Sequence, residues 1–208
     1  MVKSLHASSH TIIGKSIAFG AIGGFVAGLV MAPFIMITAI LAGMPPDTML
    51  IGMGLMFDPF SSKDAAMMVG FGMHMLTSIL IGIIFGAVTS LVKKFWITGF
   101  GKGIIEGLIT GIIAFVIVFI PISMGAMPPI LMKMAMQMNP TMTEQQIMGM
   151  MQQNMPMMIG MGILEHLVYG AVLGAVTTAL ILKTGMRRRG QEQQQQKQEQ
   201  KDTKEEWK

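Results

Sequence analysis

The chain has 208 residues, 52% of them hydrophobic and only 12% charged, and its mean hydropathy of +0.60 is too high for a soluble domain. The net charge of +4 is modest, and the membrane topology derived below explains it without a nucleic-acid partner. The sequence contains no cysteine, which excludes disulfides and thiolate metal sites.

Four stretches are long and apolar enough to cross a bilayer, whose hydrocarbon core of ~30 Å needs about 20 helical residues. None shows the polar–apolar alternation that is typical of membrane β-strands. We therefore predict an all-α membrane protein with four transmembrane helices, at residues 16–42, 67–92, 103–124 and 157–182. The first stretch is too long for a cleaved signal, so we expect it to remain as a helix.

The first predicted helix carries glycines at every fourth position, which places them on one helix face. Similar ridges of small residues mark the other three helices. In a bilayer such ridges allow close helix packing, so we predict a compact four-helix bundle. The packing glycines are Gly20, Gly24, Gly28, Gly82, Gly86, Gly103, Gly107, Gly111, Gly170 and Gly174.

The second and third predicted helices each contain an ionisable residue. His74 lies eight residues before Gly82, on the packing face, so we expect its imidazole to point into the bundle. In the third helix, Glu106 follows Lys102 by one turn, and an i, i+4 ion pair explains it structurally.

The segment between the third and fourth helices is rich in methionine. Residues 134–158 read MAMQMNPTMTEQQIMGMMQQNMPMM, and residues 127–161 hold 13 of the 26 methionines. Thr141 and Glu144 have the spacing of a capping box, which predicts a helix after them. We favour a methionine-faced helix lying on the bilayer. The alternative is a thioether site for Cu(I) or Ag(I).

The fourth helix carries Glu165 and His166. An ionised carboxylate there costs at least ~2.5 kcal/mol, so it should be partnered, neutral or facing water. With His74 these residues form a predicted polar intramembrane cluster, in which Glu165 would orient an imidazole. The glycine ridges place His166 level with Ser78 and His74 one turn farther out. The candidate metal ligands are His74, His166, Met73, Met75 and Met161.

The chain repeats itself. "GMPP" at 43–46 corresponds to "AMPP" at 126–129, and "GIIFGAVTSLVK" from Gly82 corresponds to "GAVLGAVTTALILK" from Gly170. We predict a tandem two-helix parallel repeat, covering residues 14–94 and 101–184, about an axis along the membrane normal. Its external loops, 43–66 and 125–156, should contain short extracytoplasmic interfacial helices. The predicted match sets Gly20, Gly24 and Gly28 against Gly103, Gly107 and Gly111.

Basic residues give the orientation. Nine of them flank one side of this bundle (Lys3, Lys15, Lys93, Lys94, Lys102, Lys183, Arg187, Arg188 and Arg189), whereas only Lys63 and Lys133 lie on the other. The positive-inside rule then predicts a multi-pass plasma-membrane protein with both termini cytoplasmic. Residues 1–189 form the bundle in this prediction, and residues 190–208 form a polar, low-complexity cytoplasmic tail.

Several motifs in the repeat resemble a known group. "GMPP", a histidine in the next helix, "GLITGIIAFVIVFIPISMGAM" and "EHLVYGAVLGAV" are similar to small four-helix prokaryotic integral membrane proteins that have no assigned activity. The resemblance covers roughly residues 14–182. It implies the four-helix fold and no mechanism.

The sequence shows no nucleotide-binding loop, catalytic triad, carboxylate cluster or HExxH motif, so we do not expect an enzyme. Our first interpretation is a structural or accessory membrane subunit with a methionine-rich external surface. The alternatives are a Cu(I)- or Ag(I)-binding or transport protein and a small proton-coupled transporter that uses Glu165. The expected partners are the lipid bilayer and either a second copy or a larger membrane complex. The sequence does not identify a cofactor, and copper is the candidate.

Overall fold

The computed structural model describes residues 2–184 and residue 195, and it describes side-chain surroundings from residue 13 onward. The described part is helical, with 86% helix and no strand. Apart from residue 195, the predicted tail at 190–208 lies outside the described residues, and so do Arg187, Arg188 and Arg189.

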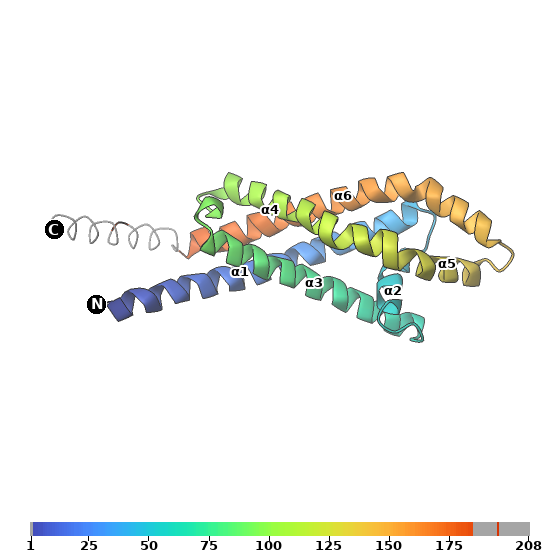
Figure 1. The fold of residues 1–208 in the computed structure, drawn as a ribbon, viewed down its shortest axis with the longest axis horizontal. Coiled ribbons are helices and arrows are strands. Elements are labelled where there is room, and N and C mark those ends of the chain that lie inside the picture. The colour runs from blue at the N-terminus through green and yellow to red at the C-terminus, as the bar shows by residue number, and fades with distance from the viewer. Residues whose placement is uncertain (1, 185–194, 196–208) are drawn as a thin grey trace.

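The helices follow one another with short connections (Figure 1). Two of the short elements, η2 and η3, are π-helical and join α4 to α5 almost without a break. Four helical stretches are long and apolar enough to span a membrane, at Ile13–Leu41, Lys63–Leu91, Phe100–Met138 and Glu144–Lys183. The elements are α1 Val2–Leu41, α2 Thr48–Leu55, α3 Lys63–Leu91, η1 Lys93–Phe95, α4 Phe100–Ala114, η2 Phe115–Phe119, η3 Ile122–Ala126, α5 Met127–Met138 and α6 Glu144–Lys183.

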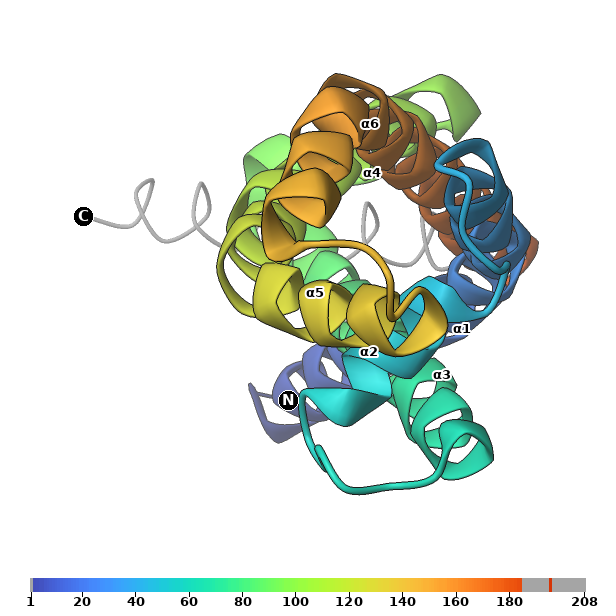
Figure 2. The ribbon, with the colours of Figure 1, turned by 90° about the vertical axis from the view of Figure 1, so that its right-hand side faces the viewer.

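The helices form two antiparallel pairs. α1 packs along α3, α4 packs along α6, and α1 and α6 join the pairs, whereas α3 and α4 barely touch (Figures 1 and 2). The start of α4, the end of α6 and η1 lie at one end, which we call the inner end. The outer end holds α2, α5 and the first turns of α6.

Large apolar side chains cover the outside of the bundle. Ile84, Ile105 and Ile117, for example, are 61%, 59% and 68% exposed. Buried positions are instead often glycine, serine or threonine. This distribution suits a lipid surround, in which apolar side chains gain little by leaving the lipid tails and small residues allow close helix contact.

The closest helix contacts involve glycine. A Cβ added to Gly20 would collide with the carbonyl oxygen of Gly82 on α3, and one added to Gly107 would collide with that of Gly170 on α6. Backbone therefore meets backbone within each pair, and no larger residue fits at these positions without a shift of a helix.

The contacts differ in register from the predicted match of Gly20 with Gly103. Gly20 meets the carbonyl oxygen of Gly82, and it is Gly107 that meets that of Gly170. Gly24 and Gly111 each meet the carbonyl oxygen one turn farther along the partner helix, that of Ser78 or His166. A ridge with a four-residue period matches itself after a shift of one turn, so spacing alone does not fix the register.

The outer end differs from its prediction as well. Most of the predicted loop 125–156 is helical, because α5 continues α4 and α6 begins at Glu144 and runs through Pro156. The sequence left open whether residues 141–156 form a separate interfacial helix or extend the last helix, and residues 144–156 extend it. The capping box of α6 uses Thr143 and Gln146, not Thr141 and Glu144: the Gln146 N–H donates to Thr143 Oγ1 at 3.3 Å, and the Thr143 N–H donates to Gln146 Oε1 at 2.9 Å. Both pairs fit the motif, and α6 starts after the turn that follows Asn139.

Candidate functional site

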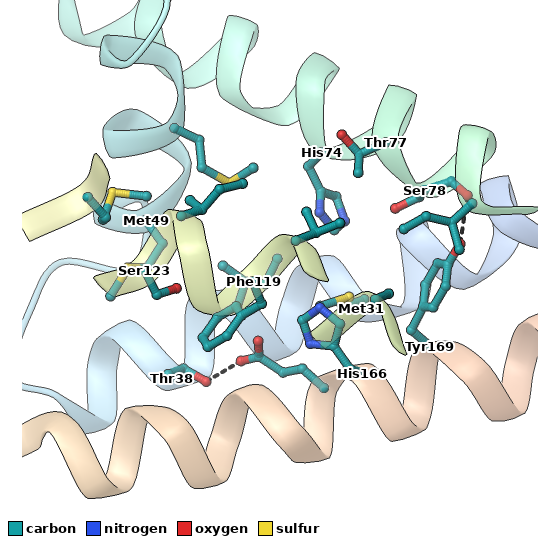
Figure 3. A pocket seen from close by; sticks show the side chains of 18 of the residues that line it. Met31, Thr38, Met49, His74, Thr77, Ser78, Phe119, Ser123, His166 and Tyr169 are labelled. Atoms are coloured by element: carbon teal, nitrogen blue, oxygen red, sulfur yellow. Dashed lines mark hydrogen bonds between the residues drawn. The ribbon is translucent and has the colours of Figure 1, made fainter. Parts of the chain in front are cut away.

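A cavity of about 140 Å³ lies between the two helix pairs, in the outer half of the bundle (Figure 3). Its walls come from α1, α2, α3, α6, the π-helical segments η2 and η3, the last residue of α4 and the first residue of α5. The predicted polar residues His74, Glu165 and His166 all line this buried pocket. They come from α3 and α6, helices that belong to different pairs.

Backbone carbonyls hold both imidazoles. Nε2 of His74 lies 3.0 Å from the carbonyl oxygen of Gly28, and Nδ1 of His166 lies 2.7 Å from that of Gly162. A carbonyl oxygen only accepts, so these ring nitrogens are the protonated ones. In the neutral imidazole the other nitrogen, Nδ1 of His74 or Nε2 of His166, then carries a free lone pair.

Aromatic rings from the π-helical segment fix the position of His166. The edges and faces of Phe115 and Phe119 meet the imidazole at centroid distances of 5.6 and 5.3 Å, with interplanar angles of 71° and 67°. Gly162 makes room for this contact, because a Cβ there would lie 2.6 Å from Cζ of Phe119. The distorted helical turn thus supports one wall of the pocket.

Glu165 is 3% exposed and accepts a hydrogen bond from the hydroxyl of Thr38 on α1. That hydroxyl also lies 3.0 Å from the carbonyl oxygen of Phe34, and its single proton serves one acceptor at a time. The prediction that Glu165 orients an imidazole is wrong here, because backbone carbonyls already take the imidazole N–H groups.

The methionines around the pocket are not those predicted. Met73, Met75 and Met161 do not line it. Met75 instead packs against α1, with its sulfur 3.3 Å from where a Cβ of Gly28 would lie. Sequence neighbours on a helix point about 100° apart, so residues that flank a histidine cannot share its direction. The methionines that line the pocket are Met31, Met49, Met53, Met127 and Met158.

Four polar residues of the pocket were not predicted from the sequence: Thr38, Thr77, Ser123 and Tyr169. The Tyr169 hydroxyl donates to the carbonyl oxygen of Ser78 at 2.6 Å and so ties α6 to α3. Thr38 had a usable signal, since it is the one hydroxyl in the apolar end of the first helix, at 33–42. Met158 had another, because it precedes His166 by eight residues and therefore shares its helix face.

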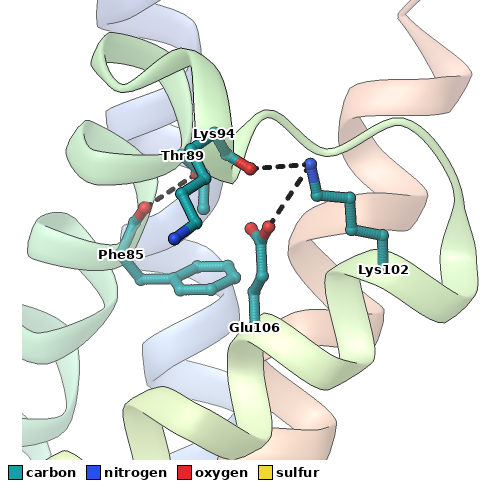
Figure 4. Close-up of polar contacts among 5 residues, drawn as sticks. All are labelled: Phe85, Thr89, Lys94, Lys102 and Glu106. Carbon is teal, nitrogen blue, oxygen red and sulfur yellow. Dashed lines mark hydrogen bonds and ion pairs between the residues drawn. The ribbon is translucent and has the colours of Figure 1, made fainter.

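Glu106 lies outside this pocket, near the inner end (Figure 4). Its Oε1 is 3.6 Å from Nζ of Lys102, which confirms the predicted i, i+4 pair. The Lys102 ammonium also donates to the carbonyl oxygen of Lys94 at 2.9 Å, which joins the start of α4 to the connection before it. We therefore assign Glu106 a structural role.

Among the described residues, no group of three or more His, Asp or Glu side chains could hold a metal ion. The donors that share the buried pocket are two imidazoles, one carboxylate and five thioethers. No protein-family model, curated protein or solved structure matches the chain. None of these comparisons supports the family resemblance suggested by the sequence. The chemistry of the site is therefore interpreted from its residues.

Proposed function

We propose that the chain is an integral membrane protein that binds a soft monovalent metal ion, Cu(I) or Ag(I), in the buried pocket. The observation that carries this proposal is which nitrogen of each imidazole is protonated. Each gives its N–H to a backbone carbonyl, which leaves the opposite nitrogen free as a ligand. Metal-binding histidines characteristically make such a bond with the nitrogen that faces away from the metal.

The other donors favour the same class of ion. Thioether sulfur is a soft ligand that selects Cu(I), and imidazole binds copper as well. These ligands are neutral, so a bound monovalent ion keeps its single positive charge. Glu165, in the same pocket and 3% exposed, would balance that charge when it is ionised.

The accessory-subunit interpretation makes the opposite prediction for the same residues. In that case His74 and His166 only connect backbone groups, and the methionines only fill space. The proton-transport interpretation relies on Glu165, and its support is the bond to Thr38, which couples a buried carboxyl to a hydroxyl on another helix. Metal binding separates the proposed function from both.

The test uses the full chain, purified in detergent and loaded with Cu(I) in the presence of a weak chelator. We expect the parent to retain one equivalent of copper, and we expect the His74→Ala/His166→Ala double variant to lose it. A matched control removes the other two histidines of the sequence, His6 and His10, and should bind as the parent does. Circular dichroism and thermal unfolding check that the variants are folded.

Two outcomes would count against the proposal. Retention by a folded His74→Ala/His166→Ala variant would place the copper outside the buried pocket. A parent that binds no copper would leave the accessory-subunit interpretation in place.

We also propose that the two helix pairs are parallel repeats within the plasma membrane. Their support is the shared contact pattern, in which Gly82 and Gly86 meet α1 as Gly170 and Gly174 meet α4. In this register Ser78 corresponds to His166, and His74 lies one turn farther out. α2 is the proposed interfacial helix, because Phe57 and Phe60, 59% and 94% exposed, follow it at the outer end.

The proposed orientation places the inner end in the cytoplasm. Among the described residues, Lys15, Lys93, Lys94, Lys102 and Lys183 belong to the inner end, and Lys63 and Lys133 to the outer. A cysteine placed at Gln146 should therefore react with an impermeant thiol reagent on intact cells, whereas one placed at Gln194 should not. The reverse result would invert the topology.

A further inference from the structure

A second and larger cavity lies at the outer end. Its volume is about 660 Å³, and it is enclosed by α5, the first turns of α6, the connection after α1 and part of η3. We call it the outer cavity. We infer that it is an entry chamber, which captures the soft metal ion and delivers it to the buried pocket. This inference rests on the proposed function.

The lining of the outer cavity is rich in methionine. Ten of its 26 lining residues are methionine, a fraction similar to that of residues 127–161, which supply most of the wall and hold 13 methionines. Leucine and isoleucine supply only four, and no charged residue lines it. A wall that only had to be apolar would draw on leucine and isoleucine as readily. Two facing sets come from α5 (Met132, Met134, Met138) and α6 (Met148, Met151, Met155).

The outer methionines are much more exposed than the polar residues of the buried pocket. Met138, Met148 and Met155 are 46%, 47% and 40% exposed, so an ion at the surface can reach them. Glu165 and His166, in the buried pocket, are only 3% and 8% exposed. An ion captured at the outer methionines would therefore be moving toward the stronger imidazole donors as it goes inward.

The two cavities share a wall. Phe119, Ser123 and Met158 line both of them, and Figure 3 shows Phe119 and Ser123 on the side of the buried pocket away from Tyr169. The two cavities are therefore adjacent, and Met158 offers a sulfur to each. Phe119 and Ser123 belong to η2 and η3, on either side of Pro121, so the π-helical turns form this shared wall.

Transfer along this route is ligand exchange. One metal–sulfur bond forms as another breaks, and the last exchange replaces a thioether by a ring nitrogen that already has a free lone pair. Thioethers are neutral, so no proton moves. The ion remains monovalent throughout, and no oxidant or reductant takes part.

The test measures the rate and stoichiometry of copper uptake by the full chain, from a coloured Cu(I)–chelator complex that loses absorbance as copper leaves it. The outer-cavity variant carries six Met→Leu changes, at Met132, Met134, Met138, Met148, Met151 and Met155. The matched control carries six Met→Leu changes at methionines that line neither cavity, Met36, Met67, Met68, Met136, Met142 and Met157. A third variant, Ser123→Leu, places a larger side chain where the two cavities adjoin and leaves every donor in place.

We expect the outer-cavity variant to keep the chelator-resistant equivalent but to load at least tenfold more slowly, and to lose any weaker equivalents that the parent takes up. The Ser123→Leu variant should slow loading alone, and the matched control should behave as the parent does. Parent-like uptake by a folded outer-cavity variant would overturn the entry chamber while the buried site stands. A parent that takes up no copper would overturn both.

Discussion

The inner and outer halves of the bundle are built on different principles. In the inner half, glycines set backbone against backbone within each helix pair, and the contacts leave no room for a methyl group. In the outer half, the helices enclose the buried pocket and the outer cavity, and two π-helical turns interrupt the third span. Methionine, an unbranched and adaptable side chain, lines the outer cavity. Glycine also brings backbones together at the outer end, where Gly54 of α2 lies against the Ala66 carbonyl and Gly70 of α3 against the Leu50 carbonyl. The adaptable region is therefore the part of the outer half that α5 and α6 enclose.

The largest expected effect comes from the inner half. Gly82→Ala would place a Cβ 2.9 Å from the Cα of Gly24 and against the Gly20 carbonyl, and neither backbone atom can yield. Because both contacts are with backbone, we expect a loss of unfolding free energy of about 3 kcal/mol or more. Gly72→Ala, on the same helix with nothing within 4 Å, should instead be neutral or stabilising by up to about 1 kcal/mol. Thermal or detergent unfolding measures both, and equal effects would remove the contrast between the halves.

A smaller effect is expected where the pocket joins the two pairs. Thr38→Val keeps the shape of the side chain but removes the hydroxyl that Glu165 accepts from. We expect it to cost about 1–3 kcal/mol, because the buried carboxyl loses its partner. Thr38→Ser retains a hydroxyl and should be near the parent. The same unfolding measurement decides between them, and a Val variant as stable as the Ser variant would mean that this bond contributes nothing.

The smallest effect is expected at the outer end. Met148→Leu and Met155→Leu exchange apolar side chains of similar size at positions that are 47% and 40% exposed. Each should change the unfolding free energy by no more than about 0.5 kcal/mol. A larger loss in either variant would show that the methionines serve packing, and that sulfur chemistry is not needed to explain them.

The features that were predictable from the sequence follow from local patterns. Composition and length predicted four membrane-crossing helices, and the described residues contain four helical stretches that are long and apolar enough to cross a membrane. The i, i+4 spacing predicted the pair of Lys102 and Glu106. The glycine ridges and the position of His74 placed the imidazole inside the bundle, where it is 6% exposed. Each of these inferences needs only one helix and its period.

The remaining features depend on contacts between helices. The methionines of the pocket come from α1, α2, α5 and α6, and no spacing along the chain connects Met31 with Met49 or Met127. The bond between Thr38 and Glu165 joins residues 127 positions apart. The extent of α6 was undecided for a different reason. The capping box predicted a helix after residue 141, but the glutamines and Pro156 gave no sign whether that helix is separate from the last one or continuous with it. A helix that extends past a lipid core can carry both.

The lysines of the inner end also provide a reference from which distances along the helices can be counted. In each long span the outermost polar residue of the buried pocket lies 18 to 23 residues from a lysine: Lys15 to Thr38, Lys93 to His74, Lys102 to Ser123, and Lys183 to Glu165. At 1.5 Å per residue these separations are all about 30 Å, the thickness of the hydrocarbon core. In the proposed orientation, with the lysines at the cytoplasmic surface, these polar residues would lie near the depth of the opposite surface. The pocket would then exchange with water on that side, and the glycine contacts of the inner half would close it toward the cytoplasm.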